Sequence, residues 1–282
     1  MNLHLTIRNL APNEMYVANQ LAEIDGRNPG LNDAEYLLSA TKGGVVAALS
    51  DTQVAGTIAA VNYDDDLSFI GLHMVIPELR GNGLSEKLLS VVMDSIGNNN
   101  IGVNCREELI PLYENFGFKP AFKIITYEGI TDGEFKMAPD IVSPLLFPFD
   151  KLYSYYEKYY HYKKKLFMNA WLNQPKSLLL GKYVDGEYKG FGLFEPCLRG
   201  YKAAPLISDN MEIAEEILIA LASHFEKGMP FYIDMPETNI NGINLVQKMN
   251  LKKVSETTRM YKGIEHENVL NNIYSFTSLE VG

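Results

Sequence analysis

One short stretch of the sequence combines residue types that could bind an anion. It reads Arg80-Gly81-Asn82-Gly83-Leu84-Ser85 and comes soon after an apolar run at 67–76. Glycine takes positive φ without steric cost, so the chain can bend there and present N–H groups at the start of a helix. These donors, the helix dipole and the charged side chain of Arg80 favour a phosphate. The same Arg-Gly-x-Gly pattern also occurs in ordinary turns, and the motif alone leaves that alternative open.

A second segment favours the interpretation of the glycine loop as an anion site. Residues 104–118 end in Leu112-Tyr113-Glu114-Asn115-Phe116-Gly117-Phe118. Together the two segments resemble the GNAT N-acetyltransferase superfamily, in which Arg-x-x-Gly-x-Gly/Ala binds the pyrophosphate of acetyl-CoA. In that superfamily the Tyr of Leu-Tyr-x-x-x-Gly-Phe lies beside the coenzyme sulfur. Here Ser85 stands where Gly or Ala is usual, and Arg106 and Leu109 replace the Asn and Ala common before the Tyr.

The resemblance assigns further residues to the coenzyme. It places the backbone of Met74 and Val75 along the pantetheine and Asn104 beside the coenzyme. The loop residues that it assigns to the pyrophosphate are Arg80, Gly81, Asn82, Gly83, Leu84 and Ser85. The expected co-substrate is therefore acetyl-CoA. No metal is expected, because His4, His161, His224 and His266 lack metal-ligand spacing with Cys or carboxylates.

Acetyl transfer to an amine needs a positioned thioester, a neutral amine and a proton for the leaving thiolate. Tyr113 is the expected proton donor; the alternative is that its ring only packs into the core. His73, directly before the loop, is the candidate base because its unperturbed pKa is near neutrality. The alternative is that His73 only lines the pocket.

These residues imply an acetyl-CoA-dependent N-acetyltransferase that acts on a primary amine in a ternary complex. The alternative is a catalytically silent CoA-binding or protein-interaction module. The expected acceptor is a small-molecule or peptide amine, and a homodimer is a possible assembly.

The elements that must position these residues follow from periodicity. An acidic turn at Asp64-Asp65-Asp66 either steers a cation or is only solvated. The helix after the loop puts Leu84, Leu88, Leu89, Val92 and Ile96 on one stripe and should stop at Gly97. Strands are expected at 2–10, 44–49, 54–62, 67–76, 101–104 and 121–128, and helices at 13–24 (capped by Asn13), 31–40 and around Tyr113.

The second half of the chain repeats the first. Pro77 corresponds to Pro205 and Gly117 to Asn250 at a nearly constant offset, which indicates a duplicated domain. Residues 151–172 read as a helix whose six tyrosines serve packing or an interface more readily than a cofactor. Further strands are expected at 177–184, 188–194, 201–207, 231–235 and 252–261, with helices at 211–227 and 240–249.

The fold class that follows is α/β (α+β), with two tandem GNAT domains, each a mixed, mostly antiparallel sheet flanked by helices. The expected order is a coenzyme-binding domain at 1–129, a Pro- and Gly-containing linker at 130–150, and a degenerate domain with a tail at 151–282.

The second copy lacks the chemistry of the first. In place of the glycine loop it reads Leu206-Ile207-Ser208-Asp209-Asn210, and an Asp at a helix start repels phosphate. We expect this copy to bind no coenzyme and to form one wall of the acceptor site of the first domain. Asp234 and Glu237 could offer carboxylates to a cationic acceptor; the alternative is that they cap the next helix.

Composition excludes several classes of function. The net charge of −10 argues against nonspecific binding of nucleic acid or an anionic membrane. No apolar run approaches the ~20 residues of a membrane span, and no signal peptide is visible. Two cysteines cannot form a disulfide framework, so a cytoplasmic location is expected.

Overall fold

The computed structural model describes residues 5–41, 44–51, 53–63, 67–97, 99–160, 164–265 and 269–282. The expected acidic turn at 64–66 and the first residues of the expected strand 2–10 lie outside the described residues.

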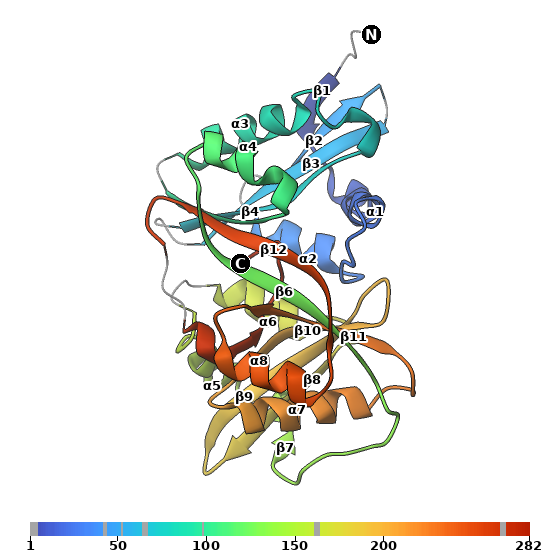
Figure 1. Ribbon diagram of the computed structural model, residues 1–282, viewed down its shortest axis with the longest axis vertical. Coiled ribbons are helices and arrows are strands. Elements are labelled where there is room, and N and C mark those ends of the chain that lie inside the picture. Colours follow the sequence, from blue (N-terminus) through green and yellow to red (C-terminus); the bar gives the residue numbers. More distant parts are fainter. Residues whose placement is uncertain are drawn as a thin grey trace.

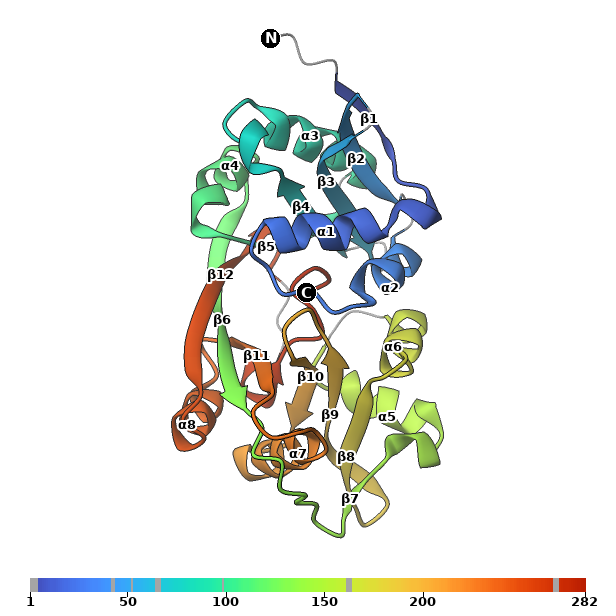
Figure 2. The same cartoon turned by 90° about the vertical axis from the view of Figure 1, so that its right-hand side faces the viewer.

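The first half is a twisted sheet with helices on both faces (Figure 1). Helices α1 and α2 cover one face, and α3 and α4 cover the other (Figure 2). Strands β1 to β4 are antiparallel, and β5 joins β4 in parallel only from Leu67–Asn100 to Ile70–Val103. The strands are β1 Leu5–Asn9, β2 Val45–Ser50, β3 Gln53–Asn62, β4 Leu67–Val75 and β5 Asn100–Cys105; the helices are α1 Tyr16–Ile24, α2 Asp33–Ala40, α3 Leu84–Ile96 and α4 Ile110–Asn115.

Local sequence determines α3 as expected. The buried residues of this helix are the five members of the apolar stripe, and Gly97 ends it with φ 75°. The expected cap of the first helix is wrong. A 3-10 turn, Pro12–Glu14, comes first, because the Glu14 carboxylate accepts from Ala11 N–H and pairs with Arg8; α1 then starts at Tyr16.

The second half has the same kind of architecture. Its strands are β7 Ile141–Val142, β8 Leu178–Val184, β9 Glu187–Pro196, β10 Tyr201–Ser208, β11 Pro230–Pro236 and β13 Ile273–Ser275; its helices are α5 Phe149–Tyr156, α6 Lys165–Leu172, α7 Met211–Ser223 and α8 Ile240–Lys248.

The single helix expected at 151–172 is wrong. The chain leaves α5 after Tyr156 and enters a second helix, α6, at Lys165. Past Tyr156 the backbone hydrogen bonds tighten from i,i+4 to i,i+3, with Lys158 N–H donating to the Tyr155 carbonyl and Tyr159 N–H to the Tyr156 carbonyl, so the helix ends there. Tyr159 donates to the Asp209 carboxylate at 2.7 Å, and Tyr160 stacks on Tyr156 with ring centroids 4.5 Å apart.

The two halves exchange a strand. Strand β6 (Lys119–Ile130) of the first half pairs with β11, and β12 (Lys252–Lys262) of the second half lies between β5 and β6. The sheet therefore runs without interruption in the order β1-β2-β3-β4-β5-β12-β6-β11-β10-β9-β8-β7. Figures 1 and 2 show β6 and β12 side by side between the halves. The expected boundaries along the chain stay a prediction, but in space each half contains a strand of the other.

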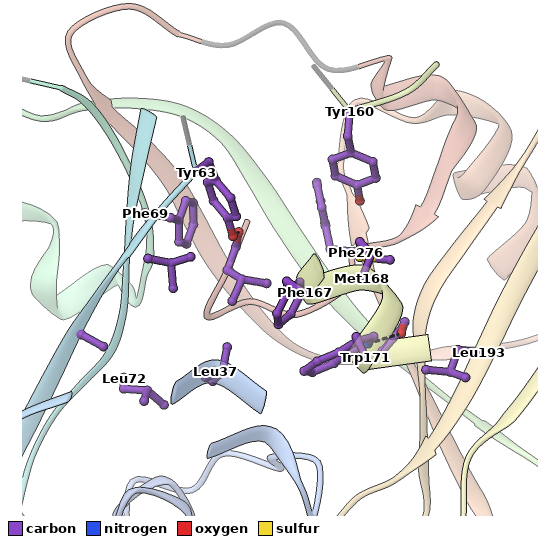
Figure 3. Packing of buried hydrophobic residues seen from close by; sticks show 14 of the residues in the cluster. Leu37, Tyr63, Phe69, Leu72, Tyr160, Phe167, Met168, Trp171, Leu193 and Phe276 are labelled. Carbon is purple, nitrogen blue, oxygen red and sulfur yellow. Dashed lines mark hydrogen bonds between the residues drawn. The ribbon is translucent and has the colours of Figure 1, made fainter. Parts of the chain in front are cut away.

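A shared hydrophobic core also joins the halves. Leu37 and Phe69 of the first half lie in one cluster with Phe167 and Trp171 of α6 (Figure 3). Trp171 is fully buried, and its indole N–H donates to the Ala204 carbonyl at 2.7 Å. Because this cluster is continuous, the two halves pack against each other through one core.

Candidate functional site

The glycine loop has the geometry expected of an anion site. Gly81 and Gly83 have φ of 74° and 77°, and Gly83 caps α3 without a side-chain hydrogen bond to the helix. A Cβ at Gly81 would meet no atom within 4 Å, so the loop is open to a ligand. Asn82 is also exposed, Leu84 is buried beneath the helix start and Ser85 is half-buried. The free N–H groups at this helix start can hold a phosphate.

Arg80 anchors the loop. Its Nε donates to the Val75 carbonyl at 3.0 Å, and its Nη2 pairs with Asp25 at 2.7 Å. The side chain stays 46% exposed, so the guanidinium can still turn a donor toward a phosphate.

His73 and Tyr113 form a buried pair. The Nδ1 of His73 lies 2.7 Å from the Tyr113 hydroxyl, and the two side chains are 5% and 1% exposed. Burial, helped by the positive charge of Arg27, lowers the pKa of His73 to about 4. Burial also raises the pKa of Tyr113 well above its usual value. At neutral pH the imidazole is therefore neutral and the phenol is protonated.

Strand β4 splays away from β5 beside this pair. Their parallel pairing ends at Ile70, and Leu72 has a φ of 51° within an irregular stretch of the β3 pairing. The side chains of Met74 and Val75 are buried, and the strand ends directly before the loop. The backbone expected to follow the pantetheine thus connects the loop with the splay.

A pocket of about 280 Å³ lies between the halves, on the α1 and α2 side of the splay. Asn104 lines it from β5; its Nδ2 donates to the Leu279 carbonyl and its Oδ1 accepts from Arg259. The charged side chains in its lining are Arg27, Asp33, Arg106, Glu128, Arg199, Lys202, Asp234, Glu256 and Glu280.

The two expected acceptor carboxylates lie in different places. Asp234 lines the pocket, accepts from Thr126 at 2.6 Å and lies 3.8 Å from the Lys202 ammonium. Glu237 is exposed and accepts the Lys123 N–H at 2.8 Å. The capping alternative is wrong for both, because Asn239 caps α8 by accepting the Gly242 N–H.

A buried charge cluster that we did not predict stands behind Asp234. Burial opposes the charged form of Lys202, but neighbouring carboxylates, including Asp234 and Asp33, outweigh it and raise the pKa of the ammonium. Burial raises the pKa of Glu195 well above its usual value. One ammonium cannot balance several buried carboxylates, so Glu195 is driven toward its protonated form.

The C-terminal segment is the other part of the site that we did not predict. Glu280 accepts the Leu72 N–H at 2.6 Å and pairs with Arg27 at 2.7 Å. Its backbone packs so closely on β4 that a Cβ at Gly71 would lie 2.2 Å from the Glu280 carbonyl oxygen. The isolated glycine inside an apolar strand was the available signal, since such a glycine often marks a close backbone approach.

Within the described part of the chain, no helix is long and apolar enough to cross a membrane. The same residues contain no group of three or more His, Cys, Asp or Glu side chains that could hold a metal ion.

Two family models, each described as an acetyltransferase (GNAT) domain, match this chain. One covers residues 34–138 and the other residues 157–275. A holothin acyltransferase from Pseudoalteromonas sp. (strain SANK 73390) is 23% identical over 271 residues, 95% of this chain and 92% of that protein.

Solved structures share the fold. A putative acetyltransferase from Pyrococcus horikoshii has a TM-score of 0.83 at 19% identity, covering 99% of this chain and 96% of its own. A GCN5-related N-acetyltransferase from Sphaerobacter thermophilus has a TM-score of 0.66 at 14% identity, with 93% and 98% covered. These matches confirm the expected fold class. The chain belongs to the GNAT acyltransferase family and carries two GNAT domains in tandem.

Proposed function

We propose that this protein is an acetyl-CoA-dependent N-acetyltransferase that acylates a primary amine by direct attack in a ternary complex. The observation that carries the proposal is the position of the β4 splay. On one side it connects with the open helix start at Gly83, and on the other with the charged pocket between the halves. A coenzyme and an acceptor can therefore meet there from opposite sides.

Tyr113 is the proton donor for the thiolate in this proposal. Its phenol is protonated at neutral pH because burial raises its pKa. His73 does not appear in the pocket lining, and burial lowers its pKa to about 4. We therefore propose that His73 orients the Tyr113 hydroxyl through the 2.7 Å contact and does not act as the base.

The acceptor is proposed to be a small-molecule or peptide amine. The acyltransferase that matches 95% of this chain is named for holothin, and this name favours a small-molecule acceptor. Asp234 offers a buried carboxylate to an ammonium. Cys105 and Cys197 are free and buried, which suits a reducing compartment and a cytoplasmic enzyme.

The test is calorimetric titration of acetyl-CoA into the wild type and Gly83→Asp. The substitution adds a negative charge where phosphate should lie, and affinity should fall at least tenfold, or ~1.4 kcal/mol. Gly186→Asp is the matched control, because Gly186 is also exposed with positive φ (84°) but lies in a turn of the second half.

Turnover is then measured as CoA release with panels of amines and acyl-CoA chain lengths. Absence of acetyl-CoA binding at millimolar coenzyme would contradict the proposal. Binding without release for any amine would favour the silent CoA-binding module.

A further inference from the structure

The C-terminal segment completes the acceptor pocket. Strand β13 pairs with β10, and the Phe276 N–H donates to the Asp234 carbonyl at 2.9 Å. The chain then crosses to the first half, where Asn104 donates to the Leu279 carbonyl at 2.7 Å and Tyr63 donates to the Val281 carbonyl. Figure 2 shows this end of the chain between the two halves. The segment is therefore held from both sides and presents Glu280 at a fixed place.

The Glu280 carboxylate lies where the pocket meets the splay of β4. One oxygen accepts the Leu72 N–H at 2.6 Å, and the other pairs with Arg27 at 2.7 Å. The side chain is 16% exposed and belongs to the pocket lining. A carboxylate has about four lone-pair sites, so each oxygen keeps one for a ligand.

The other carboxylates of the lining have different positions. Asp33 accepts the Gly30 N–H at 2.9 Å and belongs to the buried cluster around Lys202. Asp234 accepts from Thr126 on β6. Glu256 on β12 pairs with Lys123 at 2.6 Å. Glu128 on β6 accepts a hydrogen bond from the Tyr232 hydroxyl. Of the lining carboxylates in the described residues, Glu280 is the one whose hydrogen bond goes to β4, through the Leu72 N–H.

We propose that Glu280 binds the acceptor ammonium and is the general base for its acylation, an inference that rests on the proposed acyltransferase function. The carboxylate takes one proton from the ammonium. The amine lone pair then forms the C–N bond at the thioester carbonyl, and the C–S bond breaks. The second nitrogen proton neutralises the departing thiolate, through Tyr113, and Glu280 returns its proton to water. The products are the amide, the CoA thiol and one released proton.

The charges that face Glu280 come from several elements. Arg27 touches it, and Asp25 pairs with the same guanidinium at 2.7 Å. Arg106 lies 3.6 Å from Asp25 and lines the pocket.

The test compares Glu280→Gln with the wild type. Glutamine keeps an oxygen that can accept the Leu72 N–H but cannot take a proton. Loss of general base catalysis should lower kcat by ~10²–10⁴-fold, with acetyl-CoA affinity changed by less than about twofold. Glu215→Gln is the matched control, since that carboxylate is 17% exposed and ion-paired with Lys248 on the far side of the second half.

Acceptor amines of different pKa distinguish a general base from a merely structural carboxylate, because the rate loss caused by Glu280→Gln should depend on that pKa only if Glu280 is a base. A lysine-like amine (pKa about 10.4) is roughly 2,500-fold protonated over neutral at pH 7, and an α-amine (pKa about 8) only about tenfold. The loss in Glu280→Gln should be larger for the lysine-like amine and should shrink as the pH approaches the pKa of the amine. Glu280→Asp should recover part of the rate.

An equal loss for both amines at every pH would overturn the base assignment, and so would a kcat within twofold of the wild type. In both cases wild-type turnover would leave the proposed function standing. Absence of acetyl-CoA binding and CoA release in the wild type would overturn the proposed function and this inference together.

Discussion

Lowering the pH should destabilise the protein through His73. Burial, together with Arg27, lowers the pKa of this imidazole to about 4, whereas an unfolded chain has a value near 6.5. Between these pKa values the unfolded state binds more protons than the folded state. The contribution of His73 to the free energy of unfolding is therefore fully present above pH 6.5 and is lost as the pH falls toward 4. The difference between these two pKa values corresponds to roughly 3 kcal/mol of unfolding free energy, of which about 2 kcal/mol is lost by pH 5.

The measurement is urea unfolding of the wild type and His73→Asn at pH 7, 6 and 5. Asparagine cannot be protonated in this range, and its amide oxygen can accept from Tyr113 in place of Nδ1. Carboxylates that titrate in both proteins cancel in the difference. The wild type should therefore lose about 2 kcal/mol more than the variant between pH 7 and 5.

The same substitution at His224, exposed at the end of α7, is the matched control for replacing an imidazole outside the site. Parallel pH dependences of the wild type and His73→Asn would refute the reasoning, because His73 would then be solvated or charged in the folded state.

Two further substitutions test the remaining contacts. Tyr113→Phe should lower kcat by ~10²–10⁴-fold with acetyl-CoA affinity nearly intact. The substitution also removes the hydroxyl that lies 2.7 Å from His73 Nδ1. A rate within twofold of the wild type in single-turnover assays would mean that Tyr113 is only a packing residue. Gly71→Ala places a methyl group 2.2 Å from the Glu280 carbonyl oxygen, so it should cost about 1–3 kcal/mol and expose the C-terminal segment to proteases. Unchanged unfolding and digestion would mean that this segment does not pack on β4.

Much of the site's scaffold could be predicted because it depends on near neighbours in the chain. The buried stripe of α3 repeats at helical spacing, and Gly81 and Gly83 supply the positive φ that the turn requires. The duplication was visible in matched turns: Gly117 and Asn250 have φ of 88° and 54° at the ends of corresponding helices. Each of these features is decided within a few residues.

Other features depend on what lies next to a segment in space. The pattern of β12 predicts a strand, yet nothing in it states that its neighbours are β5 and β6. Tyr159 and Tyr160, which follow α5, contact Asp209 and Phe276, about 50 and 116 residues further on, and the sequence around the tyrosines does not name these partners. The carboxylate of Glu280 is unremarkable in sequence and gains its place only when the segment reaches Leu72.

The sequence by itself determined that this chain has a glycine-containing turn at a helix start, a Leu-Tyr-x-x-x-Gly-Phe segment and a second domain without that turn, and it predicted that the turn binds phosphate. Only the tertiary structure decided that the halves share one sheet, that Tyr113 contacts His73, and that Asp234 and Glu280 enter one pocket while Glu237 does not. The reason is physical. Turns, caps and amphipathic faces are set by local steric and hydrogen-bonding preferences, whereas strand neighbours and pocket walls are set by contacts between segments more than a hundred residues apart.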